Sequence, residues 1–291
     1  MNQKTIYALG FFDGVHLGHQ ALLKACGELA DRHGCNAGAV TFTVHPDALV
    51  LGNAPILLST SLDRKRLLAA YGMDSVLELP FDENLMTTHW SDFLGQLVAG
   101  GAAGFVCGTD FRFGAGGSGT AKKLEGFCKK RALPYVIVPQ QEMDGARISS
   151  TRIRALLEQG DIENANRLLG HPHILSGQVV SGQQLGHTLG FPTANLAIPA
   201  GLLTPKHGVY ACKVTVSGKI YPAITNIGAR PTVNGKGVLA ETHLIDFDGD
   251  LYGKEITVAL YAFLRPEQKF ASLEELKTQI AADVTKTREL L

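Results

Sequence analysis

Residues 6–19 read I-Y-A-L-G-F-F-D-G-V-H-L-G-H and decide the fold of the first half of the chain. The apolar run Ile6–Leu9 predicts a buried strand, and the helical pattern of Gln20–Ala30 follows the second histidine. Because His16 and His19 are three residues apart at the start of this helix, we expect them on one face, beside backbone amides that favour phosphate oxygens. The stretch therefore predicts a nucleotide site at the first strand–helix junction of an open α/β sheet.

Short apolar runs and helix-period stretches alternate from the N-terminus to about Leu169, which is typical of a doubly wound parallel sheet. The expected strands are Ile6–Leu9, Ala39–Thr43, Val76–Leu79, Phe105–Cys107 and Tyr135–Val138. We expect a Rossmann-like α/β domain over residues 1–170.

The pattern changes after the break G-H-P-H at residues 170–173. Alternating strands joined by glycine-containing turns, such as Ser217-Gly218 and Asp248-Gly249, predict a small antiparallel β-barrel or sandwich over residues 171–291. Ser272 and Glu275 form a capping box for a terminal helix. Its apolar stripe, which we expect against the barrel, consists of Leu273, Leu276, Ile280 and Val284.

Composition limits the partners of this 291-residue chain. Lys plus Arg and Asp plus Glu are both 27, so there is no basic field to attract nucleic acid or an anionic membrane. No apolar run reaches the ~18 residues of a membrane span, and the five cysteines form no C-x-x-C pair. We expect a cytoplasmic protein with small-molecule substrates, and self-association stays open.

The turn after the first strand carries the chemistry of the N-terminal half. Gly14 and Gly18 leave room for a nucleotide, and imidazoles at His16 and His19 can donate hydrogen bonds to phosphate oxygens as charge develops. Two alternatives are a chance H-x-G-H in a chain with 10 His and 33 Gly, and a zinc pair, for which no further ligand stands at a suitable spacing. The other expected nucleotide-binding residues are Gly10, Phe11 and Asp13.

A second phosphate-binding stretch is I-S-S-T-R-I-R at residues 148–154, again at the start of a helical pattern. Ser150 and Thr151 can bind phosphate, and Arg154, one turn later, can reach a pyrophosphate leaving group. Taken alone, the hydroxyls are more typical of a simple helix cap.

Residues 114–119 satisfy G-x-G-x-x-G, which by itself would indicate a dinucleotide-binding oxidoreductase. That motif has to follow a strand immediately and be followed by an acidic residue at the end of a second strand. Neither condition is met, so we interpret the stretch as a glycine loop over a ligand.

The C-terminal half contains no P-loop, but residues 182–195 read G-Q-Q-L-G-H-T-L-G-F-P-T-A-N. Its glycines can present amides to phosphates, and Thr193 and Asn195, two residues apart, offer hard oxygen ligands to Mg²⁺. A structural turn is the alternative. Glu241, in an otherwise apolar strand, either points to solvent or accepts a proton from a hydroxyl nucleophile.

The chain resembles the bacterial bifunctional riboflavin kinase/FAD synthetase family over essentially its whole length. The similar N-terminal motifs are G-F-F-D-G-V-H-L-G-H, T-F-T-V-H-P at 41–46, G-T-D-F-R-F-G at 108–114 and I-S-S-T-R-I-R. The resemblance implies that FMN attacks the α-phosphorus of ATP, with Mg²⁺ neutralising charge and with Asp110, Phe111 and Phe113 on the flavin-binding loop. Val44 stands where the family often has Pro.

The similar C-terminal motifs are G-F-P-T-A-N, N-I-G-A-R-P-T at 226–232, E-T-H-L-I-D-F and L-Y-G-K at 251–254. They imply transfer of the γ-phosphoryl of ATP to the ribityl 5′-hydroxyl of riboflavin, with Thr193 and Asn195 on Mg²⁺ and Glu241 as the base. Gly182, Gly186 and His187 would bind ATP. Because the family commonly has Arg at position 187 and a neutral His lacks its planar fork, we expect weaker ATP affinity.

Two rival hypotheses remain beside an enzyme that makes FMN and then FAD. One is an adenylyltransferase whose barrel only binds flavin, and the other is a non-catalytic flavin or nucleotide carrier.

Overall fold

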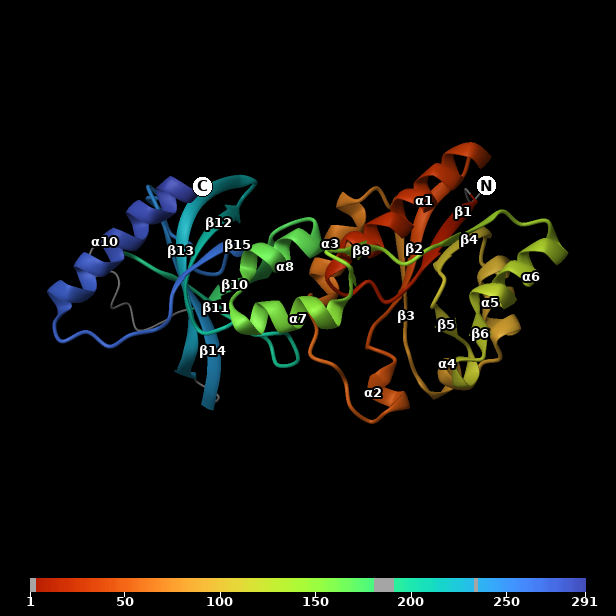
Figure 1. Cartoon of the computed structure of the whole chain (residues 1–291), viewed down its shortest axis with the longest axis horizontal. Coiled ribbons are helices and arrows are strands. Elements are labelled where there is room, and N and C mark those ends of the chain that lie inside the picture. The colour runs from red at the N-terminus through yellow and green to blue at the C-terminus, as the bar shows by residue number, and fades with distance from the viewer. Residues whose placement is uncertain (1–3, 181–190, 233–234) are drawn as a thin grey trace. The chain divides into compact units, whose positions relative to one another are not determined.

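The computed structural model describes residues 4–180, 191–232 and 235–291 (Figure 1). The chain divides into two compact units, Met1–Ser150 and Thr151–Leu291.

The N-terminal unit is built on a five-stranded parallel sheet with the strand order β3-β2-β1-β4-β7. Each of the five strands expected from the sequence is present. Their bounds are Thr5–Leu9 for β1, Asn36–Phe42 for β2, Ser75–Leu79 for β3, Ala102–Gly108 for β4 and Tyr135–Val138 for β7. The first strand lies in the middle, so the turn that follows it opens between β2 and β4, where ligands bind in sheets of this kind.

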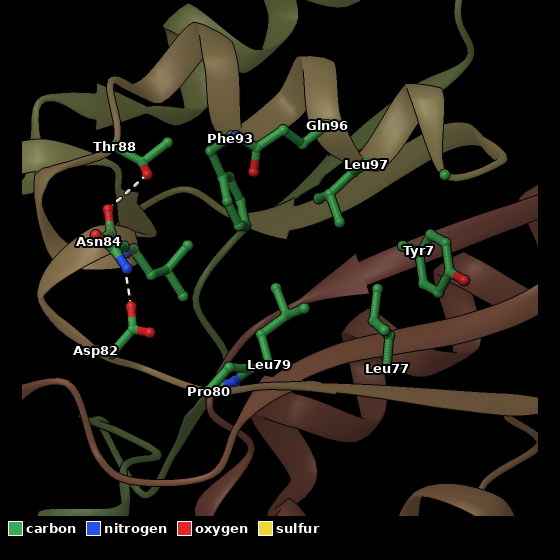
Figure 2. A pocket seen from close by; sticks show the side chains of 12 residues that line it. Tyr7, Leu77, Leu79, Pro80, Asp82, Asn84, Thr88, Phe93, Gln96 and Leu97 are labelled. Carbon is green, nitrogen blue, oxygen red and sulfur yellow. Dashed lines mark hydrogen bonds between the residues drawn. The ribbon is translucent and has the colours of Figure 1, made fainter.

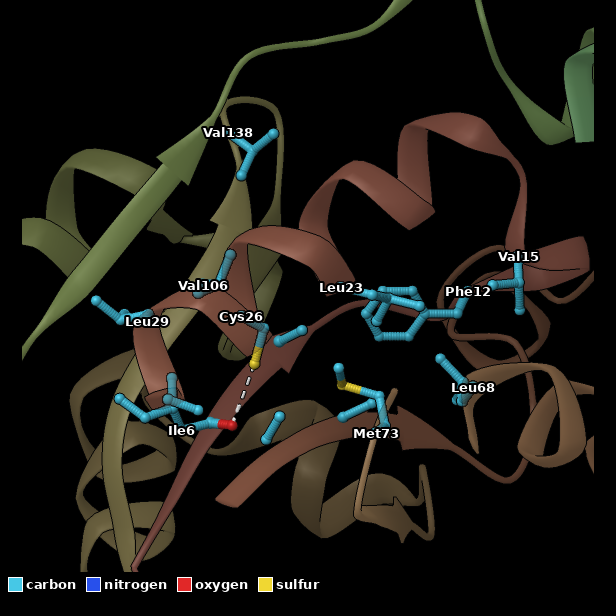
Figure 3. Close-up of a cluster of buried hydrophobic side chains, with 14 residues drawn as sticks. Ile6, Phe12, Val15, Leu23, Cys26, Leu29, Leu68, Met73, Val106 and Val138 are labelled. Carbon is cyan, nitrogen blue, oxygen red and sulfur yellow. Dashed lines mark hydrogen bonds between the residues drawn. The ribbon is translucent and has the colours of Figure 1, made fainter. Parts of the chain in front are cut away.

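Helices cover both faces of this sheet. One buried cluster joins α1 to the sheet through Leu23, Cys26 and Leu29, and the Cys26 thiol donates to the carbonyl of Ile6 at 3.2 Å (Figure 3). A second cluster includes Phe93 and Leu97 of α5 with Leu124 of α6. The helices are α1 (Leu17–His33), α2 (Asp47–Val50), α3 (Ser61–Ala70), α4 (Glu83–Thr87), α5 (Trp90–Ala99) and α6 (Ala121–Arg131).

Short elements complete the N-terminal unit. The first of two small hairpins, β5–β6, contains the glycine-rich stretch, which forms no strand-to-helix dinucleotide turn. The bounds are Arg112–Phe113 and Gly119–Thr120 for β5 and β6, Glu142–Met143 and Ala146–Arg147 for β8 and β9, Asp13–Val15 for the 3₁₀ turn η1, and Ala115–Gly117 for η2.

Two helices link the sheet domain to the barrel along the chain. Helix α7 (Ser150–Gln159) begins at the last residue of the first unit, and α8 (Ile162–Leu169) packs on β15 and β10. Asn166 of α8 fixes this packing, because its amide donates to the Leu260 carbonyl at 2.9 Å and accepts from the His173 backbone at 2.8 Å. The predicted boundary near residue 170 stays a prediction.

The C-terminal unit is a closed antiparallel barrel with the strand order β10-β11-β14-β13-β12-β15 (Figure 1). Ser217 and Gly218, at φ 48° and 76°, form the primed turn between β12 and β13, as their sequence predicts. The bounds are His173–Val180 for β10, Ala194–Ala197 for β11, Gly208–Val216 for β12, Lys219–Thr232 for β13, Gly235–Leu244 for β14 and Glu255–Arg265 for β15.

The terminal helix α10 (Leu273–Leu290) begins as predicted, because the Ser272 hydroxyl accepts from the backbone of Glu275 at 3.2 Å. Three residues of the predicted apolar stripe, Leu276, Ile280 and Val284, are half-buried, and the helix packs on β12 and β13 of the barrel as expected. Leu273 is 63% exposed, whereas the buried residues of the helix are Asp283 and Thr287. Arg265 explains the burial of the charged Asp283, because its guanidinium makes two hydrogen bonds to the Asp283 Oδ2 atom, at 3.0 and 2.8 Å.

Candidate active sites

The turn between β1 and α1 has an unusual backbone. Phe12, Gly14 and Val15 all have positive φ, at 61°, 75° and 42°. The buried Asp13 carboxylate holds the turn, since it accepts from the backbone N–H groups of Leu58 at 2.8 Å and Ser59 at 3.2 Å. Left-handed residues of this kind persist where the surroundings fix them, and they concentrate at ligand sites.

His16 and His19 lie together at the start of α1. His16 is the N-cap, and its Nδ1 accepts from the His19 backbone at 3.3 Å. The two imidazole rings stack with centroids 3.7 Å apart and planes 12° apart. The sequence spacing therefore places both rings on one face, beside the amides of the first helical turn.

The environment of His19 favours the neutral form of its ring. Burial lowers the pKa of His19 well below its ordinary value of 6.5, and the nearby His16 and Arg147 lower it further. Its Nδ1 atom is buried and has no hydrogen-bond partner within the described residues. A neutral imidazole in this position can donate one hydrogen bond to a phosphate oxygen.

The second predicted phosphate stretch meets this turn at Ser150. The Ser150 hydroxyl donates a hydrogen bond to the Asp13 carbonyl at 3.1 Å. Gly18 also lies near this stretch: a Cβ added to it would be 3.1 Å from the His16 ring and 3.9 Å from the Ile148 carbonyl oxygen. These contacts join residues that are far apart in the sequence. Thr151 and Arg154 belong to the second unit, so their place beside the histidines stays a prediction.

Arg147 is a residue of this region that sequence reasoning missed. It forms an ion pair with Asp110 and lies close enough to His19 to lower its pKa. Arg147 thus links the histidine pair to the loop after β4, which we expect to bind the flavin. The only sequence signal is its position directly before I-S-S-T.

Phe11 and the loop after β4 supply aromatic surfaces. The rings of Phe11 and His45 meet edge-on, with centroids 4.6 Å apart. The buried Arg64 guanidinium lies 4.3 Å from the centroid of the Phe11 ring. Phe111 and Phe113 stack with centroids 5.5 Å apart. These rings provide flat apolar faces of the type that bind a base or a flavin. At Gly10, an added Cβ would lie 3.0 Å from the Phe12 ring.

A hollow of about 380 Å³ lies between α5 and the sheet, with Leu77 and Leu79 facing Phe93 and Leu97 (Figure 2). Phe93 also contacts Phe113, with centroids 5.9 Å apart, so the hollow adjoins the aromatic loop. Its lining is mainly apolar with a few polar groups: Tyr7, Leu77, Leu79, Pro80, Asp82, Asn84, Leu85, Thr88, Phe93, Gln96, Leu97 and Gly100.

The barrel brings two of its predicted residues together. Asn195 on β11 is paired directly with Glu241 on β14, so their side chains share one face. The next pair along, Ala194 and Thr242, is buried, which places Asn195 and Glu241 on the outer face of the barrel. Thr193 directly precedes β11 and lines a second hollow, of about 440 Å³, with Phe247 and Tyr252. Gly182, Gly186 and His187 lie outside the described residues.

Comparisons with known proteins match each domain separately. A family model described as FAD synthetase matches residues 1–152, and one described as riboflavin kinase matches residues 169–291. The Escherichia coli K12 protein named bifunctional riboflavin kinase/FMN adenylyltransferase is 38% identical, over 98% of this chain and 92% of its own. The Listeria monocytogenes protein of the same name is 36% identical, over 97% and 91%.

A solved structure from Streptococcus pneumoniae, described as a macrolide-efflux protein, matches the fold with a TM-score of 0.87. It is 30% identical and covers 99% of this chain and 95% of that one. The α/β domain with its histidine pair and the closed barrel with its polar pair thus define a two-domain enzyme of flavin nucleotide synthesis. The chain belongs to the bifunctional riboflavin kinase/FMN adenylyltransferase family.

Proposed function

We propose that the two activities of this enzyme are divided between its domains, with the barrel acting first. The chain phosphorylates riboflavin to FMN and then adenylylates FMN to FAD, using ATP in both steps and releasing pyrophosphate in the second. The observation that carries the division is the stacked pair His16 and His19, at the first strand–helix junction of the α/β domain and outside the barrel.

In the adenylyl transfer, His16 and His19 donate hydrogen bonds to the α-phosphate and to the oxygen bridging to pyrophosphate. Charge builds on these oxygens in the transition state, and fixed donors at a helix N-terminus stabilise it without reorganisation. The turn formed by Gly10, Phe11, Asp13, Gly14 and Gly18 surrounds the nucleotide. Ser150 and Thr151 bind phosphate, and Arg154 binds the leaving pyrophosphate.

The flavin of FMN lies at the loop that carries Asp110, Phe111 and Phe113. The stacked rings of Phe111 and Phe113 support this placement, and so does the apolar hollow beside Phe93. The ion pair from Asp110 to Arg147 keeps the loop close to His19.

In the barrel, Glu241 accepts the proton of the ribityl 5′-hydroxyl as its oxygen attacks the γ-phosphorus of ATP and ADP leaves. Thr193 and Asn195 hold Mg²⁺, for which their hydroxyl and amide oxygens are suitable ligands. The direct pairing of Asn195 with Glu241 supports this assignment. When bound, Mg²⁺ neutralises charge on the transferring phosphoryl group. Gly182, Gly186 and His187 bind the ATP phosphates.

We also propose that the enzyme is located in the cytoplasm. The boundary between its two domains is proposed to lie near residue 170. The five cysteines, all of which lie in the described part of the chain, are free thiols. Within the described ranges, no helix has the length and apolar character needed to cross a membrane.

Two variants test the division of labour in one assay with riboflavin, ATP and Mg²⁺. We expect His19→Ala to stop at FMN, with adenylyl transfer at least about 100-fold slower. We expect Glu241→Gln to slow FMN formation by about 100-fold or more while still converting supplied FMN to FAD. Chromatography of the flavins separates the products.

Matched controls are His33→Ala at the exposed end of α1 and Glu255→Gln at the exposed start of β15, which should leave both rates unchanged. A protein that only carried flavin would form neither product. An adenylyltransferase with a binding barrel would form FAD from FMN and nothing from riboflavin. Either result would overturn the proposal.

A further inference from the structure

The polar pair on the barrel is part of a longer row. Glu241 is paired directly with Asn195 on one side and with Asn226 of β13 on the other. Thr225 and Thr242, the next residues along β13 and β14, are fully buried inside the barrel, where their hydroxyls are 2.8 Å apart. Asn226 therefore lies on the same outer face as Glu241, and Cβ atoms of residues paired in this way are typically about 5 Å apart.

The amide of Asn226 is oriented by a second carboxylate. Its Nδ2 donates to Oε1 of Glu267 at 3.2 Å. An ionised carboxylate only accepts hydrogen bonds, so the NH₂ group must face Glu267 and the carbonyl oxygen must face away from it. This oxygen, Oδ1, is buried and accepts no hydrogen bond within the described residues. A buried acceptor without a donor is costly unless a ligand supplies one.

Two features of the fold lie next to Glu267, which is exposed. Its carboxylate lies over Gly228, two residues beyond Asn226 on the same strand face, where any Cβ would overlap Oε1. Two residues before Glu267, Arg265 is bound to Asp283 of α10 through both Nε and Nη2. A glycine and the ion pair of Arg265 with the buried Asp283 thus help to bring the Glu267 carboxylate to the Asn226 amide.

We propose that Oδ1 of Asn226 binds a hydroxyl of the ribityl chain of riboflavin, and that Glu267 is the positioning residue that orients this amide. The inference rests on the proposed role of Glu241 and extends it. A ribityl chain offers hydroxyl donors next to its reacting 5′-hydroxyl. When Asn226 binds one of these hydroxyls, the reacting 5′-hydroxyl is placed beside the carboxylate of Glu241 on the adjacent strand.

The first test is Asn226→Asp, which replaces the NH₂ group that faces Glu267 by an oxygen of like charge. We expect the KM for riboflavin to rise about tenfold, as for the loss of one well-placed hydrogen bond. The KM for ATP and the rate of FAD formation from supplied FMN should stay unchanged. A change in the KM for ATP alone, or no change at all, would overturn the inference.

The second test reverses the hydrogen bond. In the double variant Asn226→Asp/Glu267→Gln, the new glutamine amide donates to the new aspartate, which keeps its other oxygen as an acceptor, and the total charge of the pair is restored. We expect the KM for riboflavin to return to within about threefold of wild type. A pair that served only stability would show no such recovery in KM.

The matched control is Asn164→Asp on α8. Asn164 also donates from its side-chain amide to a carboxylate, Asp161 at 2.9 Å, but α8 packs on β15 and β10 rather than on the strands of the row. The kinetic constants of this control variant should not change.

The inference and the proposed function can fail separately. If Glu241→Gln proves inactive while Asn226→Asp is normal, the inference fails and the proposed function stands. If Glu241→Gln keeps full kinase activity, the proposed function itself fails.

Discussion

His173 shows how one buried imidazole makes the stability of the barrel depend on pH. It begins β10 and is 2% exposed, and burial, followed by the influence of His171, lowers its pKa to about 3. Its Nε2 atom has no hydrogen-bond partner within the described residues. The folded barrel therefore binds this proton much more weakly than the unfolded chain does.

The sign of the effect follows from this difference. Above the unfolded pKa of about 6.5 neither state is protonated, so the contribution of the neutral ring is fully present; below it only the unfolded chain takes up the proton. We expect the free energy of unfolding to fall by up to about 1.4 kcal/mol per pH unit below pH 6.5. Urea unfolding between pH 5 and 8, followed by circular dichroism, measures this slope. His173→Gln should have a shallower slope, and equal slopes would contradict the prediction.

Asp13 combines a structural task with its place in the nucleotide turn. Because its carboxylate accepts from two buried backbone N–H groups, Asp13→Ala should destabilise the α/β domain by about 2 kcal/mol or more. Adenylyl transfer should fall with it, and riboflavin phosphorylation should not. Fluorescence of Trp90, the one tryptophan of the chain, reports unfolding of this domain. The exposed Asp31→Asn on α1 is the control, and an unfolding midpoint equal to wild type in Asp13→Ala would rule out the supporting role.

At the scale of elements, the contact between β13 and Glu267 depends on Gly228 having no side chain. Gly228→Ala leaves Asn226 and Glu267 chemically intact but forces their contact apart, since the added methyl occupies the place of the Glu267 carboxylate. We expect the riboflavin KM to rise about as much as in Asn226→Asp, with an unchanged KM for ATP. Steady-state kinetics at saturating ATP measures the effect, and an unchanged riboflavin KM would show that Glu267 does not orient the amide.

The five strands of the parallel sheet and the Ser217-Gly218 hairpin were predictable because their periodicity is local. The hairpin expected at Asp248-Gly249 was wrong, since β14 and β15 on either side of it are not neighbours in the barrel. That His16 and His19 lie on one face also follows from their spacing. The burial of Asp283 on α10 was not predictable, because it depends on the pairing of Asp283 with Arg265 on another element. The pairing of Asn226 with Glu267 has the same cause: the two are 41 residues apart, and only barrel closure brings them together. Local patterns do not specify such long-range polar partners.

At the scale of the whole molecule, the product of the barrel is the substrate of the α/β domain. Because both domains belong to one chain, each molecule carries one of each. Each domain has its own core and its own candidate site, so a substitution in one should leave the other reaction intact. This separation is what makes either activity an internal control for variants of the other.

The barrel closes unevenly around its circumference. β10 runs beside β15 from His173 to Gln178, but within the described residues it meets β11 only through Val179 with Leu196 and Val180 with Asn195. Amide protons along this seam should exchange with solvent sooner than those of β12 and β13, whose ladder is continuous. Since Asn195 lies on the seam, binding of a cation and ATP there would slow the exchange of β11 and give a measure of ligand binding that needs no turnover.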